Sequence, residues 1–74
     1  MMEKDKAREL VVKAIKREGQ RAGRAARRQD WALVRLCRGV ADNCRLYGGL
    51  DRDEFEKLYA EAYREGYDQL EGGG

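Results

Sequence analysis

The chain has 74 residues, of which 42% are hydrophobic and 41% are charged, with a formal net charge of +2. This length fits one small domain, and the lack of proline together with many Ala, Leu, Glu, Lys and Arg residues favours helices over a sheet. No apolar run approaches the roughly 18 residues of a membrane span, and the N-terminus has no apolar signal core, so we expect a cytoplasmic protein with no membrane partner.

The first predicted helix covers about residues 3–28. Apolar residues recur on one side of it at the 3.6-residue period. They are Ala7, Val11, Ala14, Ile15, Ala22, Ala25 and Ala26. Glu18 falls within this stripe, and Gly19 and Gly23 interrupt the pattern, although each glycine costs a helix about 1 kcal/mol relative to alanine. The glycine spacing favours close approach of another backbone, and a bend at 19–23 is the alternative.

The sequence favours a break near residues 28–30. Asp30 stands where an N-cap would precede a new helix. The region around Arg28–Leu33 is similar, over about ten residues, to the turn of helical-hairpin repeats such as tetratricopeptide repeats, from which no function is carried over. The apolar period nevertheless continues without a slip to Tyr47, so one long helix that packs with a later antiparallel helix and dimerises is the alternative fold.

The second predicted helix covers residues 31–47 and ends at Gly48-Gly49, which can adopt the left-handed conformation of a helix terminus. Its apolar residues are expected to face inward: Leu33, Val34, Leu36, Cys37, Val40, Ala41, Cys44 and Tyr47. Cys37 and Cys44 would lie about 10 Å apart on such a helix, beyond the reach of a disulfide, which indicates reduced thiols.

The third predicted helix covers residues 52–71, with Asp51 as N-cap and Glu54 completing a capping box. Tyr59, Tyr63 and Tyr67 lie four residues apart on one edge of its apolar face. They either pack in the core or form an exposed strip that docks a protein partner. The three helices give an all-α three-helix bundle in one domain, residues 1–71, followed by a flexible glycine tail, residues 72–74.

Arginines around the only tryptophan form the main candidate binding face. On a continuous helix, Trp31 would share one side with Arg24, Arg27, Arg28, Arg35 and Arg38. A break before Trp31 divides this stripe into two shorter basic faces and makes Trp31 the anchor of the turn. The charge distribution allows either an anionic partner or neighbouring basic and acidic helices, because residues 1–30 hold ten Lys/Arg against five Asp/Glu whereas residues 51–74 hold three against eight.

The residue types argue against catalysis. The chain has no histidine, serine or threonine, which removes the usual general base and hydroxyl nucleophiles, and two cysteines alone cannot complete a zinc site. We therefore expect a non-enzymatic binding or regulatory protein without metal or cofactor, such as a phage-like inhibitor or adaptor. Its expected partner is an acidic protein or nucleoprotein surface, with direct nucleic-acid binding or a homo-oligomer, such as a homodimer, as alternatives. The residues expected to carry this binding are Arg17, Arg21, Arg24, Arg27, Arg28, Arg35 and Arg38, with Tyr59, Tyr63 and Tyr67 as a second interface.

Overall fold

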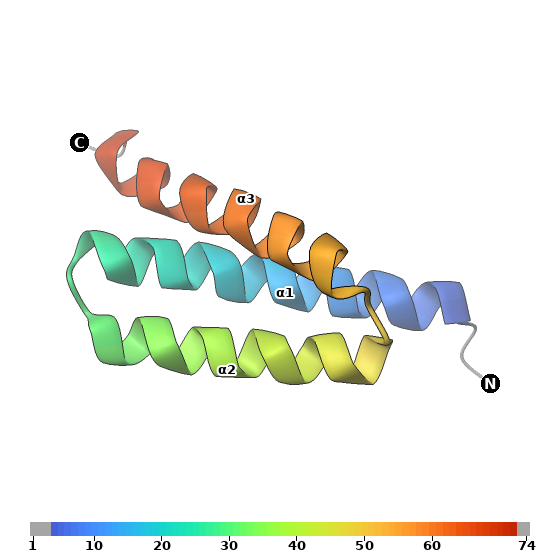
Figure 1. The fold of residues 1–74 in the computed structure, drawn as a ribbon. Helices are drawn as coiled ribbons and strands as arrows, with labels where there is room; N and C mark the ends of the chain where they lie inside the picture. The colour runs from blue at the N-terminus through green and yellow to red at the C-terminus, as the bar shows by residue number, and fades with distance from the viewer. Residues whose placement is uncertain (1–3, 73–74) are drawn as a thin grey trace.

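The computed structural model describes the backbone of residues 4–72 as three α-helices (Figure 1). They are α1 (Lys4–Arg27), α2 (Trp31–Gly48) and α3 (Arg52–Gly72). The predicted all-α bundle of three helices is confirmed, with boundaries within one residue of those expected. Gly72 is the last residue of α3, whereas the rest of the predicted glycine tail, residues 73–74, lies outside the described residues.

The turn between α1 and α2 lies where the capping signal predicted it. The Asp30 carboxylate accepts a hydrogen bond of 3.3 Å from the backbone N–H of Leu33, which satisfies one free donor at the start of α2. Gln29 adopts a left-handed backbone conformation with φ 63°, which reverses the chain. The alternative of one long helix is therefore wrong, because the capped turn competes successfully with continued helix.

The second turn also follows local chemistry. Gly49 has φ 63°, and its backbone N–H points back to carbonyls of the last turn of α2. Asp51 accepts a hydrogen bond of 3.1 Å from the N–H of Asp53 at the start of α3. The predicted capping box is not completed, because the Glu54 carboxylate accepts a hydrogen bond from Arg8 of α1 instead.

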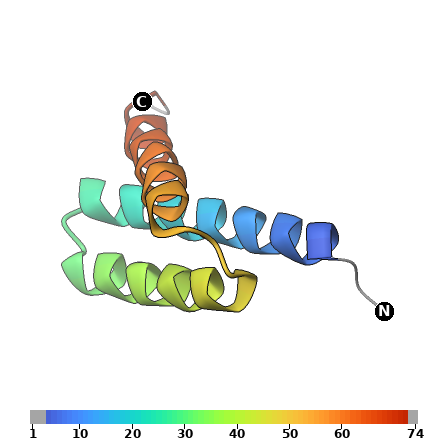
Figure 2. The ribbon, with the colours of Figure 1, turned by 45° about the vertical axis from the view of Figure 1, so that its right-hand side comes forward.

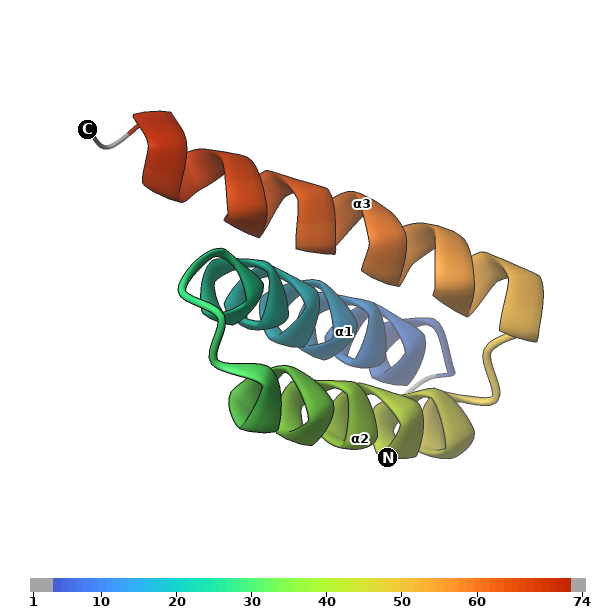
Figure 3. The same cartoon turned by 60° about the vertical axis from the view of Figure 1, so that its left-hand side comes forward.

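The central element is α1, against which both other helices pack. Because the chain reverses at each turn, α2 runs antiparallel to α1 and α3 runs parallel to it (Figure 1). Seen from a second direction, α2 remains alongside α1, whereas α3 is inclined to α1 and crosses it (Figure 2). Figure 3 shows α2 and α3 on different sides of α1, with the outer side of α2 uncovered.

Glycines permit the crossing of α1 and α3. A Cβ atom at Gly23 would lie 2.1 Å from the carbonyl oxygen of Tyr63, and one at Gly66 would lie 2.1 Å from that of Gln20. A Cβ at Gly19 would lie 2.7 Å from the Cβ of Ala62. The prediction that these α1 glycines serve close packing is confirmed, and the alternative of a bend is not, since α1 continues through both.

The core is small and lies between the three helices. Phe55, Ile15 and Cys37 are its largest fully buried side chains. Several alanines fill the remaining contact, which matches the close helix approach: Ala22, Ala25, Ala26, Ala41 and Ala62.

Candidate interaction surfaces

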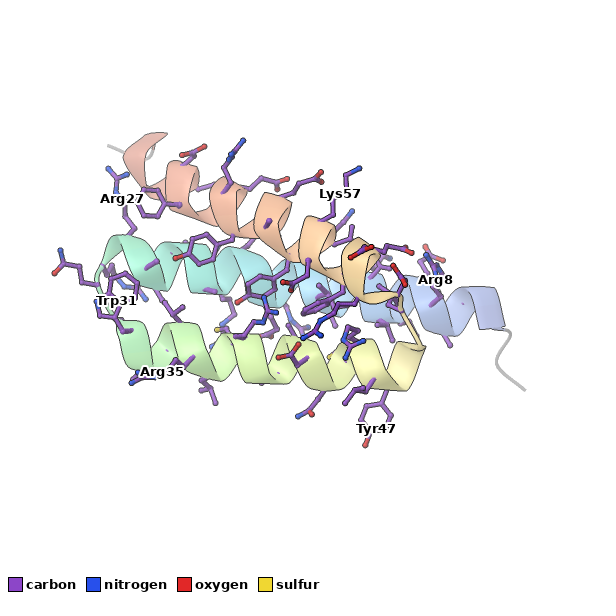
Figure 4. The ribbon with its side chains drawn as sticks, viewed as in Figure 1. Arg8, Arg27, Trp31, Arg35, Tyr47 and Lys57 are labelled. Atoms are coloured by element: carbon purple, nitrogen blue, oxygen red, sulfur yellow. The ribbon has the colours of Figure 1, made fainter. Side chains whose placement is uncertain are left out.

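The predicted arginine face is divided among different neighbours. Arg24 donates a hydrogen bond of 3.2 Å to the side-chain oxygen of Gln69 in α3. The guanidinium of Arg27 lies 5.0 Å from the centre of the Tyr67 ring, at cation–π distance (Figure 4). Both side chains therefore join α1 to α3, and the expected single arginine stripe does not form because the chain turns before Trp31.

Arg38 joins α2 to α3. Its guanidinium pairs with Glu56 and, at 3.5 Å, with Asp42. It also lies over the rings of Phe55 and Tyr59, at 4.9 and 5.0 Å from their centres. With carboxylates and aromatic rings already in contact, Arg38 is a packing residue of the bundle.

Arg17 and Arg21 flank a buried carboxylate. Glu18 is only 3% exposed, and its oxygens lie 3.4 Å from Arg17 and 3.6 Å from Arg21. Burying a carboxylate is costly unless it is paired, and these two cations provide the compensation. Their charges are thus partly committed to the protein's own core.

Cys37 lies in the same buried region. Burial raises the pKa of the Cys37 thiol, and the nearby Glu18 carboxylate raises it further. A thiol with a raised pKa remains protonated at neutral pH and is a weak nucleophile. Both Cys37 and Cys44 are free thiols in the structure.

Two of the exposed predicted arginines differ from the others because no described side chain engages them. Arg28 and Arg35 are exposed and form no ion pair with any other side chain that the structure describes. Trp31 lies at the end of the bundle where α1 joins α2, and it is 55% exposed (Figure 4). The expectation that Trp31 anchors the turn is therefore wrong, because the turn is held by Asp30 and leaves the indole largely uncovered.

The tyrosine strip is only partly a surface. Tyr59 is 6% exposed, and its hydroxyl has no hydrogen-bond partner among the described residues. Burial raises the pKa of Tyr59 to about 12. Tyr63 is half-buried beside it, and Tyr67 is exposed under Arg27. Tyr59 is thus a core residue, and its predicted role in a protein interface is wrong.

Most of the large apolar side chains that are exposed among the described residues lie on α2, which was not expected. Leu36, Val40 and Tyr47 were predicted to face inward, but they are 63%, 38% and 91% exposed, and Leu46 is 65% exposed. At about 100° per residue these four residues share one side of α2 with Ala32, Gly39 and Asn43. We call these seven residues the outer face of α2. A shallow depression lies beside Asn43, Leu46 and Tyr47.

The helix period alone could not separate this face from the core. The opposite side of α2 carries the buried Cys37 and Ala41, so α2 is apolar on both sides. A signal was nevertheless present, because residues 32, 36, 39, 43 and 46 follow the alternating four- and three-residue spacing of a coiled-coil seam.

No protein-family model matches the chain, and neither the curated proteins nor the solved structures give a match. None of the helices in residues 4–72 is long and apolar enough to cross a membrane. The described residues also contain no cluster of three or more His, Cys, Asp or Glu side chains that could hold a metal ion.

Proposed function

We propose that the protein is a non-enzymatic interaction module that binds another polypeptide through the outer face of α2. The observation that carries this proposal is the exposure of Leu36, Val40, Leu46 and Tyr47 along one continuous side of a helix. Contiguous exposed apolar surface on a small domain is typical of a protein-binding site. A module of this kind acts by occluding or recruiting its partner.

The balance of energies favours this face over the arginines as the source of affinity. Burying a Leu or Val side chain contributes about 1.5–3 kcal/mol, whereas an exposed ion pair contributes about 0–1 kcal/mol. Arg28 and Arg35 lie near one end of the outer face and are the predicted arginines that form no ion pair, hydrogen bond or ring contact with the described side chains. They supply preference for acidic groups on the partner and faster association rather than most of the affinity.

Site-specific photocrosslinking tests this proposal. With benzoylphenylalanine at position 36 or 46, we expect a crosslinked polypeptide from cells that make the protein. The same group at Ala60 or Arg64, on the exposed side of α3, provides a matched control and should give no such product. An excess of unlabelled wild-type chain should suppress the product, whereas an excess of the Leu36→Asp chain should not. No product from position 36 or 46 would overturn the proposal.

The exposed Trp31 between Arg28 and Arg35 favours a second candidate function, the binding of single-stranded nucleic acid. A base could stack on the indole while the arginines contact phosphates. Trp31 is the only tryptophan, so its fluorescence reports contact directly. If this function holds, oligonucleotide should quench the fluorescence, and the logarithm of the affinity should fall with the logarithm of salt with a slope of about −1.4, from two phosphate contacts. The Arg28→Glu/Arg35→Glu chain should lose this binding. Unchanged fluorescence at low salt would eliminate this candidate.

A further inference from the structure

We infer that the polypeptide bound by the outer face of α2 is a second copy of the same chain, with the two α2 helices antiparallel. This inference rests on the proposed function and names the partner. It follows from three features of α2: an unexplained glycine, the spacing of the apolar residues, and the order of the charges along one edge.

Gly39 is the glycine that the single chain does not explain. A Cβ atom at Gly39 would meet nothing within 4 Å, although a glycine inside a helix costs about 1 kcal/mol relative to alanine. By contrast, an added Cβ at Gly19, Gly23 or Gly66 would collide with a neighbouring helix. Gly39 lies at the middle of the outer face, where a second helix could approach as closely as α3 approaches α1.

The spacing fixes which residues face each other. In coiled-coil terms Leu36 and Asn43 occupy one set of seam positions, and Ala32, Gly39 and Leu46 occupy the other. An antiparallel pair places one set opposite the other, so Leu36 of each copy lies over Gly39 of its partner. Asn43 then lies opposite Ala32, so in both of these layers the larger residue meets the smaller one, as close packing requires. Leu46 lies opposite Gln29, in the turn before α2 of the partner copy.

The charges favour this alignment of the two α2 helices. Arg35 and Asp42 lie seven residues apart on the same edge of the seam. In the antiparallel pair, Arg35 of each copy meets Asp42 of the other, which gives two symmetric ion pairs. Shifting one copy by a heptad would instead place Asp42 against Asp42 of the second copy or, in the other direction, Arg35 against Arg35, and like charges in contact are unfavourable. Arg35 has no ion pair with any described side chain of its own chain, whereas Asp42 lies 3.5 Å from Arg38 of its own chain and would contact two arginines in the dimer.

The rest of the bundle leaves room for this arrangement. Figure 3 shows α1 and α3 on one side of α2, so the outer face can receive a second chain without movement of either. A two-fold axis through the α2 pair makes the contact self-complementary and closed. The net charge of +2 per chain opposes association only weakly.

A charge-exchange experiment tests both the dimer and its register. The wild-type chain should sediment with about twice the monomer mass of 8.5 kDa. Arg35→Glu and Asp42→Arg should each weaken the dimer by about tenfold or more, because each sets like charges against each other twice. An equimolar mixture of the two variants should recover the wild-type affinity, because every facing pair is again opposite in charge. Gly39→Leu should give a folded monomer, which circular dichroism would verify.

The outcomes separate this inference from the proposed function. A wild-type chain that remains monomeric at all concentrations overturns the dimer, while a crosslink from position 36 to a different polypeptide would leave the proposed function standing. A dimer in which Arg35→Glu has no effect overturns the antiparallel register. A dimer that forms without any crosslink from position 36 or 46 overturns both, because the copies would then meet on another surface.

Discussion

Replacement of Gly23 by alanine is expected to lower the melting temperature by roughly 4–16 °C. The new Cβ atom would lie 2.1 Å from the carbonyl oxygen of Tyr63 and 2.7 Å from the backbone nitrogen of Tyr67. Because these neighbours are backbone atoms of a helix, α3 must move away from α1, and overpacking at the upper end of the usual range costs about 2–3 kcal/mol. The better helix propensity of alanine offsets about 1 kcal/mol of this cost. One kcal/mol corresponds to about 4–8 °C for a domain of this size. Thermal unfolding followed by circular dichroism measures the effect.

Gly39→Ala is the matched control, since it makes the same chemical change where an added Cβ meets nothing within 4 Å. At dilutions where the chain is monomeric, it should raise the melting temperature by about 4–8 °C, because alanine is favoured in a helix by about 1 kcal/mol. Equal stability of Gly23→Ala and wild type would show that α1 and α3 do not cross at this glycine.

Local chemistry was sufficient to predict where the helices begin and end. Asp30 and Asp51 are capping residues, and Gly49 supplies the left-handed terminus of α2. Each of these signals acts within a few residues, so it is readable without knowledge of the tertiary fold. The packing role of Gly19 and Gly23 was also predictable, because two glycines in a long helix need a neighbour to explain them.

The surfaces could not be predicted to the same degree, because they depend on how many neighbours each helix has. The apolar period of α2 is the same whether one side or both sides are covered, so Leu36 and Tyr47 were assigned to the core although they are exposed. The position of α3 likewise determines which arginines contact another helix and which remain free. Arg24 and Arg27 reach α3 while Arg28, one residue beyond Arg27, remains free of it, and sequence spacing carries no information on that difference.

The contacts within the bundle also change which surface is the best candidate for binding. The sequence placed function on the basic residues, but most of those are engaged by Glu18, Glu56, Gln69 or aromatic rings of the bundle. The apolar outer face of α2 has no such internal partner among the described residues. A surface whose interactions are unsatisfied within the chain is a stronger indication of a partner than one whose charges are already paired.

Tyr59→Phe is expected to stabilise the protein by about 1 kcal/mol at neutral pH. The Tyr59 hydroxyl is buried without a hydrogen-bond partner among the described residues, and an unsatisfied buried polar group costs about 1–3 kcal/mol. Phenylalanine keeps the ring contacts with Phe55 and Tyr63 and removes that cost. Denaturant unfolding of both chains measures the difference. A lower stability of Tyr59→Phe would mean that the hydroxyl has a favourable partner.

The advantage of Tyr59→Phe should grow in alkaline solution. The pKa of Tyr59 is raised from 10.0 to about 12 by burial, so the folded state holds its proton after the unfolded state has lost it. The contribution of the Tyr59 proton to the free energy of unfolding is therefore fully present below about pH 10. It falls by about 2–3 kcal/mol as the pH rises to about 12, and about half of it is lost by about pH 11. Tyr59→Phe has no such proton to lose.

Tyr47→Phe is the control, because the Tyr47 side chain is 91% exposed. Its stability should follow the wild-type curve, which separates the effect of burial at Tyr59 from the general titration of tyrosines and lysines. Parallel curves for wild type and Tyr59→Phe between about pH 8 and about pH 11 would show that the Tyr59 hydroxyl is not held in the desolvated core.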